Sequence, residues 1–346
     1  PPANDRSLPF ILRDEYAALT GPIHFDIPYS LFKVRGSYTS SSLRRQYFRA
    51  VQWYQQVPFF VESPALSRYA LDMGELLKEN PDLLKQYDSM NSLLGTLVGD
   101  SNELDAGDYA HAITDLGESA HDPSKLNVYL DGRKPLEKIK TLPALYAGME
   151  VVSVEEVMKQ ERSMRFLSQK FMPDSYWTGK LTQGDEKPAV NGLKLPRGAS
   201  SLEVMTLLGS SYAQSQLPSL SFYGQYKAGI DARLAELRDE ATGWGGEYWQ
   251  SNQTTSVLWT ISGLFDWLLK HKTEAPQFMH SGLWDAKTLL TGSGFWTEMR
   301  HTNILYGAQS YAEKGGGSDD ECDTRAVPPP PQGYVEPQPE AYDRLS

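Results

Sequence analysis

Two residues near the C-terminal end of the chain have the types and the spacing for acid–base chemistry. Glu298 and His301 are three residues apart in a segment whose apolar pattern predicts a long helix over residues 293–312, so their side chains lie one turn apart on one face. A carboxylate and an imidazole so placed can transfer protons or bind a metal ion, and Glu118 and His121 repeat the spacing. Pairing with neighbouring ionisable side chains is the third interpretation.

Four carboxylates stand close together in the middle of the chain: Asp100, Glu103, Asp105 and Asp108. Carboxylate oxygens are the ligands that Ca²⁺ prefers, so these residues form a candidate calcium site. The ligand spacing of an EF-hand is absent. The alternative is that these side chains cap a helix and interact with its dipole.

The segment after residue 243 is rich in aromatic residues. Trp244, Tyr248 and Trp249 are predicted to line a ligand-binding groove, because aromatic rings stack on the apolar faces of sugars and peptides. Trp259 and Trp267 follow in a segment that is apolar nearly all round. Helical spacing makes burial in the core the competing interpretation for the whole group.

Two residues are candidates for covalent modification. Asn252 begins the triplet Asn-Gln-Thr, which is an acceptor pattern for glycosylation. Cys322, the single cysteine, stands in an acidic run, and it cannot form a disulfide within the chain. Because the acidic neighbours disfavour the thiolate, we interpret Cys322 as a loop thiol, with pairing to another chain as the alternative.

Composition and motifs exclude several classes of function. The chain has 346 residues and a formal net charge of −11, and this charge is unfavourable for nucleic-acid binding. It has no apolar run of the length that spans a membrane. It also lacks a phosphate-binding loop and the nucleophile elbow of many hydrolases, so a hydrolase would have to rely on paired carboxylates.

The elements that would position these residues are mainly helices joined by long irregular loops. Apolar periodicity predicts helices over residues 43–57, 64–78, 81–99, 109–116, 124–134, 154–171, 200–208, 219–242, 248–271 and 293–312. We expect one large multi-helix domain over residues 1–314, with an α/α toroid as the favoured arrangement. Residues 315–346, rich in Gly, Pro and acidic residues, are expected to form a strap or linker.

Short segments spread over residues 33–344 carry a resemblance to a known family. The segments are Val34–Tyr38, Tyr47–Tyr54, Val98–Ser101, Phe171–Tyr176, Pro196–Gly198, Glu203–Ser210, Trp296–His301, Tyr306–Tyr311 and Tyr334–Pro337. In this order they resemble the bacterial extracytoplasmic family called domain of unknown function 3160. The resemblance implies a mostly helical protein that is secreted or lipid-anchored, and it implies no activity. The family pattern leads us to expect Asp after Arg300 and His301, where this chain has Thr302.

Two hypotheses about function follow. The first is a structural or binding role at the cell surface, within an assembly formed with other chains or with flanking fragments of the same precursor. We expect a precursor, with a lipid anchor as one option, because the chain begins without Met or a signal peptide. The alternative is a secreted hydrolase that acts on polysaccharide or peptide through carboxylate acid–base catalysis. Both place the protein outside the cytoplasm, in the extracellular medium, on the cell surface or in the periplasm.

Overall fold

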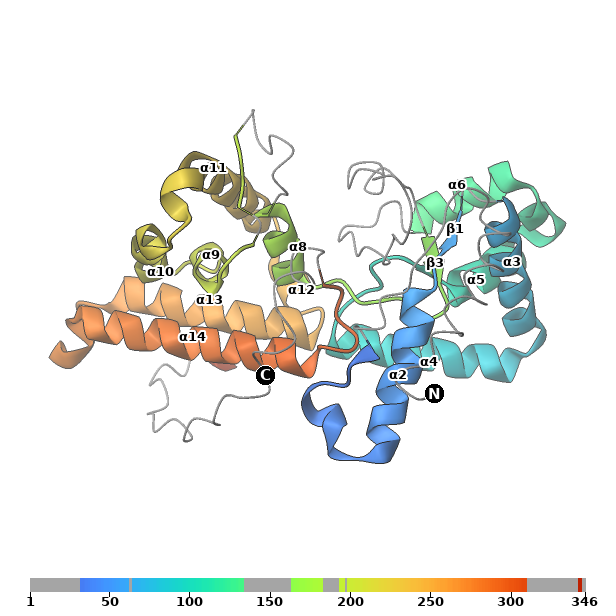
Figure 1. Cartoon of the computed structure of the whole chain (residues 1–346), viewed down its shortest axis with the longest axis horizontal. Coiled ribbons are helices and arrows are strands. Elements are labelled where there is room, and N and C mark those ends of the chain that lie inside the picture. Colours follow the sequence, from blue (N-terminus) through green and yellow to red (C-terminus); the bar gives the residue numbers. More distant parts are fainter. Residues whose placement is uncertain are drawn as a thin grey trace. The chain divides into compact units, whose positions relative to one another are not determined.

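The computed structural model describes residues 32–61, 64–133, 163–182, 193–196, 198–309 and 342–343. These residues are mainly helical, as predicted (Figure 1). The chain divides into two compact units, which are described separately below. Apart from residues 342 and 343, the predicted strap at 315–346, including Cys322, lies outside the described residues. The boundary at residue 314 and the toroidal arrangement stay predictions.

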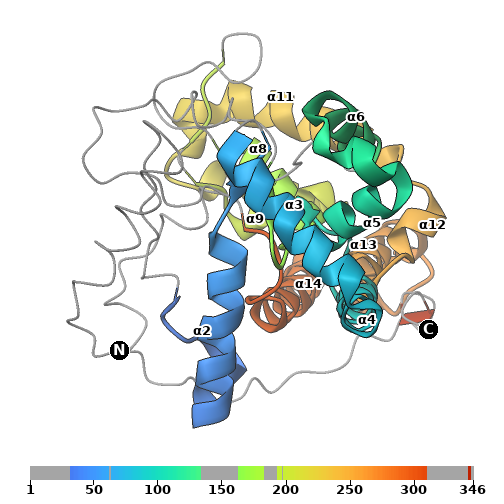
Figure 2. The ribbon, with the colours of Figure 1, turned by 90° about the vertical axis from the view of Figure 1, so that its right-hand side faces the viewer.

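Unit 1 comprises Pro1–Gly95, Asp100–Phe171 and Ile304–Ala308. Its helices are α2 (Ser42–Gln56), α3 (Pro64–Glu79), α4 (Pro81–Leu97, which continues into unit 2), α5 (Ala106–Leu116) and α6 (Pro123–Arg133). Helices α3 and α5 lie side by side (Figure 1, Figure 2). Their close approach requires Gly74, because a Cβ at this position would lie 2.9 Å from the backbone of Tyr109.

A small sheet in unit 1 joins three short strands, β1 (Phe59–Phe60), β2 (Leu104–Asp105) and β3 (Ser163–Arg165). Strand β3 is central: it pairs antiparallel with β1 and parallel with β2. The prediction of a helix over residues 154–171 is therefore wrong from Ser163 onward, and residues 154–162 lie outside the described part of the chain. Strands of two or three residues are too short to show the alternation of polar and apolar residues by which a strand is recognised.

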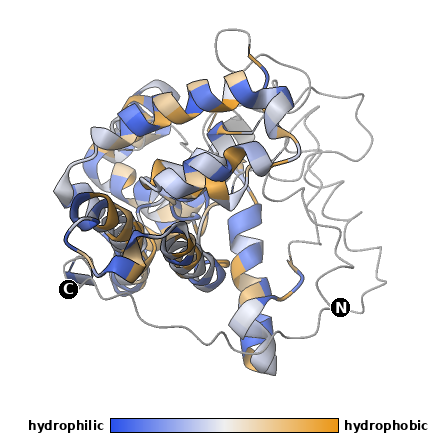
Figure 3. Ribbon diagram, turned by 90° about the vertical axis from the view of Figure 1, so that its left-hand side faces the viewer, coloured by the Kyte–Doolittle hydropathy of each residue, from blue (hydrophilic) through white to orange (hydrophobic). Residues whose placement is uncertain are grey.

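Unit 2 comprises Thr96–Gly99, Met172–Asn303 and Gln309–Ser346. Its helices are α8 (Pro173–Lys180), α9 (Ser201–Leu207), α10 (Ser211–Gln216), α11 (Tyr223–Thr242), α12 (Gly246–Trp249), α13 (Gln253–His271) and α14 (Gly282–Thr302). Helices α13 and α14 pack against each other along their length (Figure 1). Apolar and polar residues are mixed along the helices, as Figure 3 shows, which is typical of helices with one buried face.

Several helix boundaries in unit 2 differ from the prediction. The helix predicted over 293–312 spans Gly282–Thr302, and the helix predicted over 219–242 begins at Tyr223. Helix α14 begins at Gly282 and continues through Gly292 and Gly294, where the sequence suggests a break. Position 292 requires glycine, because a Cβ there would lie 2.8 Å from the ring of Phe265 on α13. The predicted helix over 248–271 is interrupted, because Asn252 accepts a hydrogen bond from the Thr255 backbone and begins α13 there.

Candidate functional site

The three aromatic residues predicted to line a groove come together in unit 2. The ring centroids of Trp244 and Tyr248 are 4.8 Å apart, those of Trp244 and Trp249 are 5.4 Å apart, and those of Tyr248 and Trp249 are 5.6 Å apart. All three side chains are half-buried. Behind them, the buried ring of Trp177 on α8 is stacked parallel to Trp244, with centroids 5.8 Å apart and an interplanar angle of 6°. We call Trp244, Tyr248 and Trp249 the aromatic cluster.

The chain that carries the aromatic cluster leaves the rings accessible. Helix α11 ends at Thr242, and the short helix α12 begins at Gly246. The glycines Gly243, Gly245 and Gly246 surround Trp244 in the sequence, and all three are exposed. Because a glycine has no side chain, these positions cannot cover the neighbouring rings. The turn therefore presents aromatic surface to solvent, and this surface is anchored through Trp177.

A polar contact lies beside the stacked tryptophans. The hydroxyl of Tyr176 on α8 donates a hydrogen bond of 3.2 Å to Glu240 Oε2 on α11. Burial, and then the negative charges of Glu240 and Glu236, raise the pKa of Tyr176 to about 12, so the hydroxyl stays protonated at neutral pH. Lys180 Nζ lies 5.5 Å from the centroid of the same ring.

Helix α8 is held in place by a buried carboxylate. Asp174, which is fully buried, accepts hydrogen bonds at Oδ2 from Trp296 Nε1 at 2.8 Å and from Arg300 Nη1 at 2.7 Å. Trp296 and Arg300 belong to α14, and the guanidinium lies over the indole at 5.3 Å from its centroid. Because a buried ion pair with this geometry resists displacement, it fixes the part of α8 that carries Tyr176 and Trp177.

The candidate acid–base pair on α14 lies at the surface. Glu298 and His301 are both exposed. Within the described residues no hydrogen bond or ion pair joins either side chain to another group. The sequence repeat behaves differently: His121 Nε2 lies 3.3 Å from Glu75 Oε1 rather than pairing with Glu118. Acid–base catalysis by Glu298 and His301 stays a prediction, and no contact supports it.

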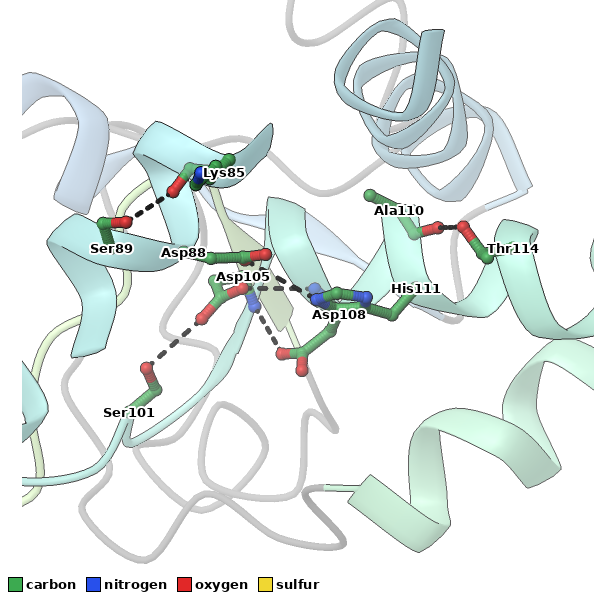
Figure 4. Close-up of polar contacts among 9 residues, drawn as sticks. All are labelled: Lys85, Asp88, Ser89, Ser101, Asp105, Asp108, Ala110, His111 and Thr114. Carbon is green, nitrogen blue, oxygen red and sulfur yellow. Dashed lines mark hydrogen bonds and ion pairs between the residues drawn. The ribbon is translucent and has the colours of Figure 1, made fainter. Parts of the chain in front are cut away.

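Three of the four carboxylates of the candidate calcium site have protein partners in unit 1, and Figure 4 shows those of Asp105 and Asp108. Asp105 and Asp108 form a capping box at the start of α5, in which each side chain accepts a hydrogen bond from the other residue's backbone N–H. Glu103 is buried and forms an ion pair with Arg165 of β3 at 3.2 Å, while Asp100 is exposed. No group of three or more potential ligand side chains converges among the described residues. For Asp105 and Asp108 this geometry corresponds to the capping interpretation, and the calcium site stays a prediction.

Lys170 is a buried cation that was not singled out from the sequence. It is 1% exposed, and its ammonium group donates to Ser101 Oγ at 2.9 Å and to Asn91 Oδ1 at 3.2 Å. Ser101 Oγ in turn donates to Asp105 Oδ2 at 3.2 Å, a contact that Figure 4 also shows. The serine hydroxyl thus connects a lysine to a carboxylate, an arrangement that stabilises a buried charge.

The predicted glycosylation site has a structural role in the folded chain. The Asn252 side chain caps α13, and Thr254 of the same triplet is 1% exposed. Thr254 Oγ1 accepts a hydrogen bond from Asn303 Nδ2 at 2.9 Å. A glycan on Asn252 would be attached to Nδ2, which donates to Ser251 Oγ at 3.0 Å, whereas the cap of α13 is made by Oδ1 of the same side chain.

Comparison with known proteins places the chain in a family. The model of the family described as protein of unknown function (DUF3160) matches residues 7–346. The chain belongs to the DUF3160 family. No curated protein and no solved structure matches it. The resemblance drawn from short sequence segments is therefore confirmed at the level of the family.

Two of the segments that resemble the DUF3160 family meet at Asp174. The segment Phe171–Tyr176 supplies Asp174, and Trp296–His301 supplies Trp296 and Arg300, which stand 122 and 126 residues further along the chain. The sequence pattern points to Glu298 and His301 in the second segment. The structure assigns the buried contacts instead to Trp296 and Arg300, which occupy the inward face of the same helix turn.

Proposed function

We propose that this DUF3160 protein is a ligand-binding protein that acts outside the cytoplasm, and that the aromatic cluster is its binding surface. The observation that carries the proposal is the gathering of three half-buried aromatic rings, backed by Trp177, at a turn whose glycines leave them uncovered. Aromatic surface left accessible to water is unfavourable for the isolated chain, and it is typical of sites that stack on a ligand.

The geometry favours a ligand with an extended apolar face. The three rings pack against one another at centroid distances of 4.8 to 5.6 Å, so a ligand must lie on their outer surface. Sugar rings and peptide side chains both offer such faces, which gives polysaccharide and peptide as the two ligand classes. Tyr248 and Trp249 belong to α12, and Trp244 in the preceding turn is stacked on the buried Trp177 of α8, so the surface exists before the ligand binds.

The proposed location rests on the extracytoplasmic character expected of the family. We place the protein in the extracellular medium, on the cell surface or in the periplasm, in an assembly with other chains or with fragments of its own precursor. No helix among the described residues is both long enough and apolar enough to cross a bilayer. Association with a surface through the aromatic cluster suits a structural or adhesive role.

The proposal is tested by co-sedimentation with insoluble cellulose, chitin and peptidoglycan, and by binding to an immobilised peptide library. The wild-type chain is expected to bind one of these materials, and Trp244→Ala should weaken that binding about tenfold, because it removes the ring that contacts the other two and Trp177. Trp267→Ala is the matched control: this half-buried tryptophan stacks on His271, outside the aromatic cluster.

Two results would contradict the proposal. Equal binding by the wild-type chain and Trp244→Ala would mean that the ligand lies elsewhere. Absence of binding to every material, with Trp244→Ala changing only the melting temperature, would mean that the rings serve only to hold the α11–α12 turn. Circular dichroism on each variant establishes that it is folded.

A further inference from the structure

Two neighbouring contacts join α8 to the end of α11. Tyr176 and Trp177 are consecutive on α8. Glu240 lies in the last turn of α11, and Trp244 follows it by four residues. Tyr176 donates its hydrogen bond to Glu240, and Trp177 stacks on Trp244. The polar pair and the stacked pair therefore join the same two parts of the chain, and the exposed Glu240 stands four residues before Trp244 of the aromatic cluster.

We propose that Glu240, oriented by the Tyr176 hydroxyl, is the specificity-determining residue of the aromatic cluster, and that the ligand is an uncharged carbohydrate. The inference rests on the function proposed above and names its ligand class. In the proposed complex, a sugar ring stacks its C–H face on the exposed aromatic surface. Its hydroxyl groups donate hydrogen bonds to Glu240.

The carboxylate explains why the sugar hydroxyls would be recognised. Each carboxylate oxygen can accept two hydrogen bonds, and Tyr176 occupies one position on Oε2. The remaining positions suit the several hydroxyl donors of a sugar. Hydrogen bonds to a charged acceptor are stronger than those between neutral groups, so this carboxylate can contribute as much to affinity as one stacking ring.

The same features are unfavourable for two other ligand classes. An anionic ligand, such as a uronic acid polymer, would bring its charge against the exposed Glu240 and Glu247 carboxylates. A quaternary ammonium group requires rings that surround it, and rings whose centroids are 4.8 to 5.6 Å apart contact one another and leave no space between them. A neutral sugar needs only one outer face and a nearby acceptor.

Tyr176 acts as a positioning residue rather than as a contact of the ligand. Its hydroxyl fixes the Glu240 rotamer, and the ion pair of Asp174 with Arg300 fixes α8. Replacement of Tyr176 by Phe keeps the ring but removes the hydrogen bond to the carboxylate. We expect a smaller loss of affinity than for Glu240→Gln, since the carboxylate is then still present but less ordered.

The test is isothermal titration calorimetry of the full chain with cellohexaose, chitohexaose, mannohexaose and maltohexaose, and with hexagalacturonate and choline as charged probes. At least one neutral oligosaccharide is expected to bind. Glu240→Gln should weaken its binding about tenfold or more, and Tyr176→Phe should weaken it about threefold. Asp239→Asn is the control, because this exposed carboxylate is next to Glu240 in the sequence but about 100° around α11.

The other outcomes distinguish a failure of this inference from a failure of the proposed function. If Glu240→Gln binds a neutral sugar like the wild type and Trp244→Ala does not, Glu240 has no role in specificity, while the binding function stands. If only hexagalacturonate or choline binds, and Trp244→Ala abolishes that binding, the carbohydrate class or its neutrality is wrong. If no probe binds and the co-sedimentation assay is also negative, the proposed function itself fails.

Discussion

At the scale of the residue, the buried charges of unit 1 depend on single partners. Glu103 is almost fully buried, and its oxygens accept hydrogen bonds from Arg165 Nη1 at 3.2 Å, from the Gln169 backbone at 2.9 Å and from Asn102 Nδ2 at 3.1 Å. A carboxylate in such a place is tolerated because these three donors take the place of water.

Arg165→Met should therefore destabilise the protein by about 3–5 kcal/mol, because it leaves the Glu103 charge buried without its cation. The free energy of unfolding is measured with urea. Arg68→Met is the control: Arg68 forms an exposed pair with Asp72 at 3.6 Å, and its loss should change stability by about 1 kcal/mol or less. Similar losses in the two variants would show that the buried pair is worth no more than the exposed one.

A second prediction at this scale concerns Tyr176. Burial is the largest cause of the raised pKa of Tyr176, and the charge and hydrogen bond of Glu240 raise it further. Glu240→Gln should therefore lower that pKa from about 12 towards the ordinary value. Because the folded pKa is raised, the contribution of Tyr176 to stability is complete below the unfolded value. It is lost as the pH rises from there towards about 12.

Nuclear magnetic resonance of isotope-labelled tyrosine measures this titration, and Tyr176→Phe identifies the signal. An unchanged pKa of Tyr176 in Glu240→Gln would mean that the hydrogen bond seen in the structure does not form in solution.

At the scale of the element, two glycines of α14 have opposite effects on its stability. Gly292 faces α13, where a Cβ would lie 2.8 Å from Phe265 Cζ and 3.1 Å from Ile261 Cγ2. Gly294, on the same helix, is exposed, and a Cβ there would meet nothing within 4 Å. One glycine is required by packing, and the other only weakens the helix.

We expect Gly292→Ala to destabilise the protein by about 1–3 kcal/mol through steric overlap, although alanine is the better helix former. Gly294→Ala should stabilise it by about 0.5–1 kcal/mol, since the helix gains propensity without a clash. Thermal unfolding of the two variants gives the comparison directly. A stabilising Gly292→Ala would mean that the two helices are further apart in solution.

At the scale of the whole molecule, three of the four carboxylates of the candidate calcium site contact protein groups. Asp105 and Asp108 cap α5, Glu103 pairs with Arg165, and the net charge of −11 is distributed over the chain. A protein that binds an ion only in its folded state becomes more stable when the ion is added.

We therefore expect millimolar Ca²⁺ or a chelator to change the melting temperature by less than about 1 °C. Differential scanning calorimetry and metal analysis of the purified chain check this. A clear rise with Ca²⁺ that is absent in Asp108→Asn would show that the carboxylates of the candidate site bind the ion after all.

The helical class of the fold and the family were within reach of the sequence alone. Helical periodicity and capping residues act over three to seven positions, so the helices α2, α9, α11 and most of α13 follow from local pattern. The grouping of Trp244, Tyr248 and Trp249 was also visible, because they are close together in the sequence, whereas their role in lining a ligand-binding groove stays a prediction.

The partners of the buried groups were decided only by the tertiary structure. Glu103 meets Arg165 across 62 residues, and Asp174 meets Trp296 across 122, distances over which no periodicity is visible. The need for glycine at position 292 of α14 is likewise decided by the approach of α13. In each case a local pattern stated what a residue could do, and packing against a distant element determined which of those roles it has, because burial and charge pairing depend on neighbours in space.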